Sequence, residues 1–235
     1  MNVRYFDPAA FVDYLLNYFL MGGVLVTIGL TLAGVAGGLV LGMIIALMRM
    51  SENRALYGFA RVYIWFFRGT PLLIQLVVIY TGLPQLGIKL GVVGSALVGL
   101  ILHEASYLAE IIRSGFMSVQ HGQREAALAL SVPKRTIFWR VMLPQAFRLM
   151  IPPFGNSVNS LLKATSLASV ISVEEIMRRS DMLMQEHFQI LEVYAAAAVY
   201  YLLLVSIWDL VQQRLEHHFG RALDRNAKPI PAKRH

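Results

Sequence analysis

The sequence contains no cysteine and few charged residues. Without cysteine, the chain can form no disulfide, no thiolate zinc site and no cysteine-ligated cluster. Charged residues make up 15% of the 235 residues, against about a quarter in a soluble domain. Hydrophobic residues make up 57%, and the mean hydropathy is +0.57. These values indicate a chain whose main solvent is the lipid bilayer.

Several motifs that define other classes of protein are also missing. There is no G-x-x-x-x-G-K-S/T loop, so any ATP hydrolysis would belong to a partner. Neither H-E-x-x-H nor G-x-S-x-G occurs, and an intramembrane hydrolase would need a nucleophile and a base within its spans. The absence of internal inverted repeats argues against an independent secondary transporter. The sequence therefore predicts no enzyme activity, metal site or cofactor within this chain.

Five apolar segments are long enough to cross a bilayer, which takes about 20 residues. Their approximate bounds are 19–48, 59–84, 91–112, 149–173 and 190–210. Two adjacent prolines, Pro152 and Pro153, are expected near the start of the fourth helix, where a first turn tolerates proline. We predict an all-α integral membrane protein with one transmembrane domain over residues 1–235.

The formal net charge of +7 is spread in short blocks between the apolar runs, which argues against nucleic-acid binding. The segments 49–61, 113–148 and 209–235 carry net charges of +2, +5 and +3, whereas 1–13 and 174–192 carry −1 and −3. Loops rich in Lys and Arg stay in the cytoplasm. The N-terminus is therefore expected outside, and the C-terminus and the loop over about 114–148 are expected inside.

The first apolar segment has Gly34, Gly38 and Gly42 on one helical face. Glycines at this spacing let a neighbouring helix approach closely. We expect the neighbour to belong to the same subunit rather than to a dimer seam.

The most informative loop reads GQREAALALS over 122–131, then VPKRTIFWR and VMLP up to Pro144. Two prolines, Pro133 and Pro144, divide it into short helices predicted at 123–131 and 134–143. The second helix has an apolar face and a basic face. From the residues alone, this face suits a lipid surface or a partner's groove equally well.

This loop resembles the EAA signature of permeases in bacterial ATP-binding-cassette (ABC) importers, with its Glu-Ala-Ala and Leu-Pro at the family spacing. Serine stands where the family has glycine, and valine where it has isoleucine. The serine deprives the turn after the first short helix of a residue free to adopt the left-handed conformation. The resemblance assigns ATPase coupling to Gly122, Glu125, Ala126, Ala127, Ser131, Val141, Leu143 and Pro144.

Three further elements resemble permeases for polar amino acids: FRGTPL over 67–72, EASYLAEIIR over 104–113, and LPQA over 143–146 followed by the two prolines. The resemblance covers about residues 20–215. It implies a type I importer permease in the bacterial inner membrane. It also implies three partners: a second permease subunit, identical or homologous, an ATPase dimer that binds ATP and Mg, and a periplasmic or lipid-tethered amino-acid-binding protein. The matched permeases carry acidic, amide, basic and sulfur-containing amino acids alike.

Ionisable and amide side chains inside the spans are candidates for the pathway or a gate, because charges in a bilayer usually face protein or water. Arg68 is expected either to act as a gate or as a partner for Glu110, or to form a structural ion pair that holds helices together. Glu104 is expected either to contact a substrate amino group or to bond within the bundle. A polar stripe on the fourth span, formed by Asn156, Asn159 and Lys163, is expected to line the pathway or to form a buried, hydrogen-bonded seam. The complete set is Arg68, Thr70, Gln75, Glu104, Glu110, Asn156, Asn159 and Lys163.

Overall fold

The computed structural model describes residues 6–119 and 121–224, which form helices and connecting turns without a β-strand. The α-helices are α1 (Pro8–Leu15), α2 (Tyr18–Arg49), α3 (Arg54–Gly69), α4 (Leu72–Val77), α5 (Val92–Met117), α6 (His121–Ala129), α7 (Lys134–Ile137), α8 (Leu143–Ala164), α9 (Ile176–His187) and α10 (Ile190–Asp224). Two π-helical turns, η1 (Val78–Gly82) and η3 (Phe138–Met142), and two 3-10 segments, η2 (Leu83–Leu86) and η4 (Thr165–Ile171), complete the helical elements of the described residues.

Four of the helices begin at a side chain that caps exposed backbone N–H groups. The side chains of Asp7, Asn17, Asn53 and Glu175 accept hydrogen bonds from the first turns of α1, α2, α3 and α9. Short polar side chains at this position satisfy donors that have no partner within the helix. The starts of these four helices are therefore set by polar residues in the local sequence.

Three helices are long and apolar enough to cross a membrane: α2, α5 and residues 190–219 of α10. The pair formed by α3 and residues 72–86 would make a fourth span, although it bends by 103°. The helix α8 does not meet the same standard of length and hydropathy. The expected count of five spans thus stays a prediction.

The segment predicted as a second span over 59–84 is a bent pair rather than one straight helix. The bend falls at Thr70 and Pro71, and Thr70 adopts an extended conformation with φ −112° and ψ 142°. A residue before proline is driven out of the helical region by the proline ring, which accounts for the end of α3.

The expected position of Pro152 and Pro153 at a helix start is wrong. The helix α8 begins at Leu143 instead of near residue 149, so both prolines lie in its interior. Pro144 occupies the first turn, where its missing N–H costs nothing.

Close packing of α2 against α5 rests on the glycine face of α2, where Gly34, Gly38 and Gly42 are all buried. A Cβ atom added to Gly38 would lie 2.9 Å from Cγ of Glu104, and one added to Gly42 would lie 3.0 Å from the carbonyl oxygen of Ala105. The expected close approach of a neighbouring helix within the subunit is confirmed.

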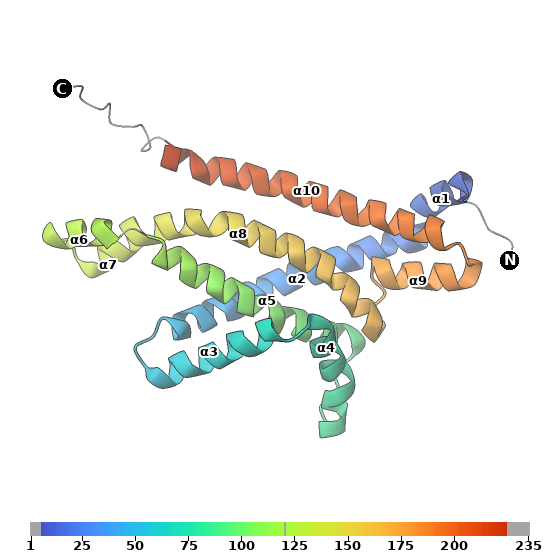
Figure 1. Ribbon diagram of the computed structural model, residues 1–235, viewed down its shortest axis with the longest axis horizontal. Helices are drawn as coiled ribbons and strands as arrows, with labels where there is room; N and C mark the ends of the chain where they lie inside the picture. The colour runs from blue at the N-terminus through green and yellow to red at the C-terminus, as the bar shows by residue number, and fades with distance from the viewer. Residues whose placement is uncertain (1–5, 120, 225–235) are drawn as a thin grey trace.

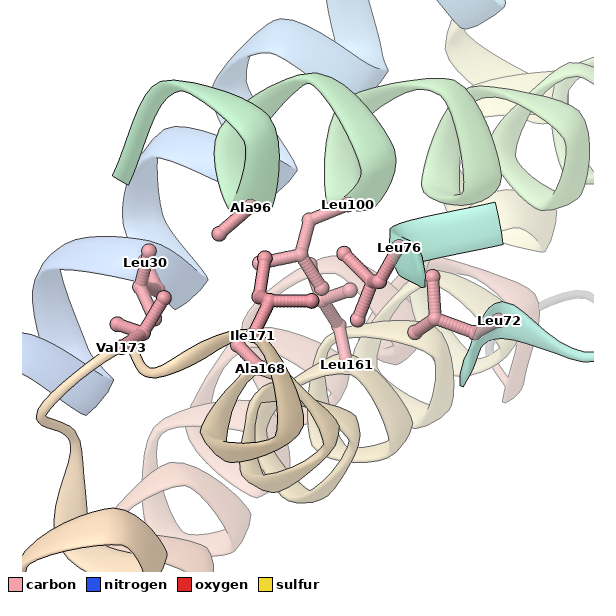
Figure 2. Close-up of a cluster of buried hydrophobic side chains, with 9 residues drawn as sticks. All are labelled: Leu30, Leu72, Leu76, Ala96, Leu100, Leu161, Ala168, Ile171 and Val173. Atoms are coloured by element: carbon pink, nitrogen blue, oxygen red, sulfur yellow. The ribbon is translucent and has the colours of Figure 1, made fainter. Parts of the chain in front are cut away.

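The helix α4, which follows the bend, packs into a buried apolar cluster. Figure 2 shows side chains from α2, α4, α5, α8, η4 and the turn after η4 converging there: Leu30, Leu72, Leu76, Ala96, Leu100, Leu161, Ala168, Ile171 and Val173. Because five elements share this core, it fixes the position of α4 relative to α5 and α8.

The two ends of the molecule differ in charge. In Figure 1, α1 and α9 lie at one end of the long axis, and α6 and α7 lie at the other. The connection between α2 and α3 lies at the α6 end as well. The net-positive blocks 49–61 and 113–148 thus gather at one end, and the net-negative block 174–192 lies at the other.

Candidate functional site

The helix α6 stands at the end of the bundle with its side chains turned outward. Both Glu125 and Ala126 are exposed, and Ala127 is half-buried. The arm behind it is anchored, because Ile137 of α7 is 3% exposed and Phe138 stacks on Phe116 of α5 with ring centroids 5.7 Å apart. The Glu-Ala-Ala surface is thus presented on a support that is itself packed into the bundle.

The turn that follows α6 uses the left-handed conformation in spite of its serine. Ser131 has φ 56°, its N–H donates to the carbonyl oxygen of Leu128 at 2.9 Å, and the N–H of Val132 donates to that of Ala127 at 3.1 Å. This pair of hydrogen bonds is the Schellman ending of a helix, in which glycine is the usual left-handed residue. The substitution of serine for the family's glycine therefore leaves the turn geometry intact at a cost in backbone strain.

The remaining coupling candidates lie around α6 and at the start of α8. Gly122 is exposed, and a Cβ atom added there would meet nothing within 4 Å. Val141 and Leu143 are half-buried, Pro144 is exposed, and the neighbouring Gln145 donates from Nε2 to the carbonyl oxygen of Val141 at 2.8 Å. The same Nε2 donates to Oε1 of Gln123 at 2.5 Å, which ties α6 to the start of α8.

Two of the predicted pathway residues, Thr70 and Gln75, stabilise the bend between α3 and α4. Gln75 is 5% exposed, and its Nε2 donates to the carbonyl oxygens of Phe67 and Thr70 and to Oγ1 of Thr70 at 2.9–3.1 Å. Carbonyl groups at a helix end need such partners. The structure gives Gln75 a structural contact at this bend.

The cationic side chain of Arg68 is exposed and lies over the ring of Tyr107, 5.0 Å from its centroid. Glu110, the partner considered for Arg68, is bound instead by Arg113, with a 2.7 Å contact between Oε2 and Nη2. Within the described part of the chain, Arg68 forms no ion pair within 4 Å. The guanidinium thus remains available at the surface beside an aromatic ring.

Figure 1 shows α5 and α8 side by side, and a polar cavity of about 350 Å³ lies between them. Glu104 is 3% exposed and accepts a hydrogen bond of 2.7 Å from Oγ of Ser157. The polar lining residues are His103, Glu104, Tyr107, Asn156, Ser157 and Ser160. Tyr107 lines this cavity and lies under the guanidinium of Arg68, which is not itself among the lining residues.

The polar stripe on α8 divides between two neighbours. Asn156 lines the polar cavity, whereas Asn159 donates from Nδ2 to Oδ1 of Asp209 on α10 at 3.0 Å. Lys163 is exposed in the last turn of the helix. Asn156 thus faces a cavity and the half-buried Asn159 contacts α10, while the expected roles of pathway lining and buried seam stay predictions.

Sequence reasoning did not select Tyr107, Ser157 or Ser160 as site residues. Tyr107 lies three residues after Glu104, a spacing that places two side chains on one helical face, and that signal could have found it. Ser157 lies 53 residues from Glu104, and no local pattern connects the two.

Comparison with known proteins identifies the family to which the chain is similar. A family model described as a binding-protein-dependent transport system inner membrane component matches residues 38–221. The L-cystine transport system permease protein TcyB of Bacillus subtilis is 40% identical over 203 residues, covering 86% of this chain and 87% of that protein. The arginine transport system permease protein ArgU of Corynebacterium glutamicum is 38% identical over 227 residues, covering 91% and 72%.

Solved structures agree on the fold. A crystal structure of an amino acid ABC transporter with histidines has a chain that is 32% identical, with a TM-score of 0.85 over 93% of this chain and 100% of that one. An inward-facing structure of the MetNI methionine ABC transporter matches with a TM-score of 0.72 at 20% identity, covering 86% and 96%. The family match extends over the polar cavity and α6, and the fold match covers nearly the whole chain. The chain therefore belongs to the inner membrane components of binding-protein-dependent transport systems, and it is an ABC importer permease rather than an enzyme.

Proposed function

We propose that the chain forms the translocation pathway for a polar amino acid and is coupled through α6 to a separate ATPase dimer. The observation that carries the substrate class is the polar cavity between α5 and α8, which Glu104 lines and whose lining residue Tyr107 lies under the guanidinium of Arg68. A zwitterion needs a partner for its ammonium and one for its carboxylate. Relatives named for cystine, arginine and glutamine support the same class.

The roles of the two charges can be separated by substitution. Arg68→Ala removes the carboxylate partner and should lower uptake, whereas Arg68→Lys keeps the charge but loses the planar fork and should retain part of it. Glu104→Gln keeps the hydrogen bond to Ser157 and removes the charge opposite the substrate ammonium. Radiolabelled uptake at several substrate concentrations is the measurement. Wild-type rates in Arg68→Ala and Glu104→Gln would contradict the pathway assignment.

Coupling is assigned to Glu125, Ala126 and Ala127 because their helix is exposed at an end of the bundle and matches the EAA spacing. The carboxylate can accept charge-assisted hydrogen bonds from the rim of a groove in the ATPase, and two methyl side chains permit close approach. Partners in this proposal are an ATPase dimer holding ATP and Mg, a second permease subunit and a periplasmic amino-acid-binding protein.

Glu125→Lys tests the coupling assignment directly. The variant should lose both the co-purifying ATPase and receptor-stimulated ATP hydrolysis in lipid, while the permease inserts normally. The matched control is Glu186→Lys, a charge reversal at an exposed carboxylate of α9 on the opposite end of the molecule. If Glu125→Lys retains the bound ATPase and full stimulation, α6 does not couple the subunits.

We also propose five spans in one domain, with α8 as the fourth and the α6 end in the cytoplasm. The separation of net charge between the two ends supports this orientation. The cysteine-free chain suits a labelling test, because Lys89, Gln185 and Arg135 are all exposed. Cysteines at Lys89 and Gln185 should react with an impermeant thiol reagent in intact cells, and one at Arg135 should react only after lysis. Labelling at Arg135 in intact cells would reverse the orientation.

A further inference from the structure

A second cavity, of about 380 Å³, lies between α2, α5, α8 and α10 and differs from the polar one in its lining. Apart from Gln212 and Gly155, every residue that lines it is hydrophobic or aromatic, as Met43, Leu108 and Phe154 illustrate. The two cavities share Ile111 and are otherwise lined by different residues of α5 and α8.

The N–H donors of the two lining side chains that carry them, Trp208 and Gln212, already have acceptors within the protein. The indole N–H of Trp208 donates to the carbonyl oxygen of Gly155 at 2.9 Å, and Nε2 of Gln212 donates to Oε1 of Glu216 at 2.7 Å. A cavity without convergent polar partners does not hold ordered water, and such cavities take up apolar ligands. The occupant should therefore be a hydrocarbon rather than a hydrated molecule.

The apolar cavity opens to the outside of the molecule. Although they line it, Leu39 and Met43 of α2 are each 41% exposed, and Leu215 of α10 is 37% exposed. The helices α2 and α10 are candidate membrane spans. Elsewhere on their outer faces, Leu32 and Ile207 are 65% and 59% exposed. An opening on such a surface meets lipid acyl chains.

Arg148 on α8 follows the lining residue Phe147 and is half-buried. Arg214 on α10 precedes the lining residue Leu215 but lines a separate pocket with Leu210, Gln213, His217 and His218. Arg148 forms no ion pair within 4 Å in the part of the chain that the structure describes. A guanidinium matches the geometry of a phosphate and binds it through two hydrogen bonds.

We propose that this apolar cavity binds one acyl chain of a phospholipid, whose phosphate is held by Arg148. The bound chain fills the space between α2 and α10 that their own side chains leave open. The choice of a lipid over a second permease copy rests on the proposed function, since that places the pathway on the side of the polar cavity. A lipid-binding measurement is independent of transport, so its failure leaves the pathway assignment standing.

Trp208 lines the cavity and serves as the probe. The permease is purified in detergent with its co-purifying subunits, in a Trp65→Phe, Trp139→Phe variant that keeps Trp208. Phosphatidylglycerol with brominated acyl chains, a contact quencher, is then titrated. Trp208 should be quenched saturably at about one lipid per chain, with reversal by excess unbrominated lipid. The comparison variant keeps Trp65, which is 73% exposed on α3 and should follow the lipid-to-detergent ratio without saturation.

Two further variants locate the lipid. Met43→Phe fills the cavity and should weaken the Trp208 titration at least tenfold, whereas Leu32→Phe adds the same bulk to an exposed position of α2 outside the cavity and should leave it unchanged. Arg148→Gln should weaken it as well, whereas Arg214→Gln, in a separate pocket, should leave it unchanged. Assembly of each variant is checked by size-exclusion chromatography. Unsaturable quenching of Trp208, or full binding by Met43→Phe, overturns the site; full binding by Arg148→Gln overturns the phosphate contact.

Discussion

Two short helical segments lie between long helices: α6 with α7 forms one, and α9 with the residues that begin it forms the other. They differ in whether their carboxylate side chains are exposed or buried. On α6, Glu125 is exposed. At the start of α9, Glu175 is 0% exposed, accepts a 2.5 Å hydrogen bond from the hydroxyl of Tyr201 and accepts another from the N–H of Arg178. A carboxylate whose hydrogen bonds are made within the subunit holds the fold, whereas an exposed one is available to a partner.

Arginine shows the same contrast. Arg179 of α9 donates from Nη1 to the carbonyl oxygen of Phe19 at 2.6 Å, and its guanidinium lies 4.7 Å from the centroid of the Phe19 ring. Arg124 of α6 is exposed. Similar sequence composition thus gives, at the α9 end of the molecule, an arginine held by contacts within the subunit and, at the α6 end, an exposed arginine.

The largest effect on uptake should come from a bulky side chain added to the exposed surface of α6. Ala126→Trp should abolish uptake, because the indole blocks close approach of the ATPase, while the thermal unfolding midpoint changes by less than about 2 °C. Uptake and thermal unfolding in detergent measure the two effects. The same substitution at the exposed Met182 of α9 should spare coupling. An unfolded Ala126→Trp protein would show that α6 is part of the core.

At the α9 end, Glu175→Ala should destabilise the permease by about 3 kcal/mol, since the hydroxyl of Tyr201 and the N–H of Arg178 lose their acceptor. Glu125→Ala is the matched control and should leave stability unchanged. Denaturant unfolding of both variants gives the comparison. Equal stability of the two variants would remove the distinction between the segments.

The buried carboxyl of Glu175 should also make the folding stability of the permease depend on pH. Burial raises the pKa of this carboxyl, although hydrogen bonds from Tyr201 and the backbone act in the opposite direction. A raised pKa in the folded state means that stability from this group is present at low pH. It is lost as the pH rises from the unfolded value of about 4.3 through the folded value. Glu175→Gln should flatten this part of the pH–stability profile, and an unchanged slope would exclude Glu175 as its source.

A smaller effect is expected from adding one methyl group to a glycine at each end. A Cβ atom at Gly23 would lie 2.9 Å from the backbone nitrogen of Ile176, whereas one at Gly122 meets nothing within 4 Å. Gly23→Ala should cost about 2 kcal/mol because the backbone of α9 must shift. Gly122→Ala should be neutral or stabilising by about 0.5 kcal/mol. Thermal unfolding of the two single variants decides, and a neutral Gly23→Ala would mean that α9 is loosely held.

The smallest effect concerns the turn after α6. Ser131 adopts φ 56°, and glycine there removes a strain of about 1 kcal/mol. Ser131→Gly should slow amide hydrogen exchange at the end of α6 and leave uptake intact. Ser172→Gly is the control at the other end, since Ser172 has φ 68°. Faster exchange in Ser131→Gly would show that the serine side chain itself stabilises the turn.

Some of the fold and site follows from local sequence. The glycine face of α2 and the divided loop at 122–144 are patterns over a few residues, and the structure has α2 packed through its glycines and short helical segments in that loop. Loop charge separates into two ends for the same reason. The start of α8 was misplaced because the apolar run begins only near residue 149, whereas the helix already begins at Leu143 and continues through Pro152 and Pro153.

The tertiary structure decided the rest. Glu104 meets Ser157 across 53 residues, Asn159 turns to Asp209 rather than to the polar cavity, and Gln75 reaches back over the bend to Phe67. Each contact depends on how two helices pack, which no single helical periodicity specifies. The sequence alone determined that this chain spans a membrane, carries an EAA loop and lacks an ATP-binding loop. Packing determined which polar side chains face a cavity and which hold the bundle together, because a buried polar group must find its partner wherever the neighbouring helix places one.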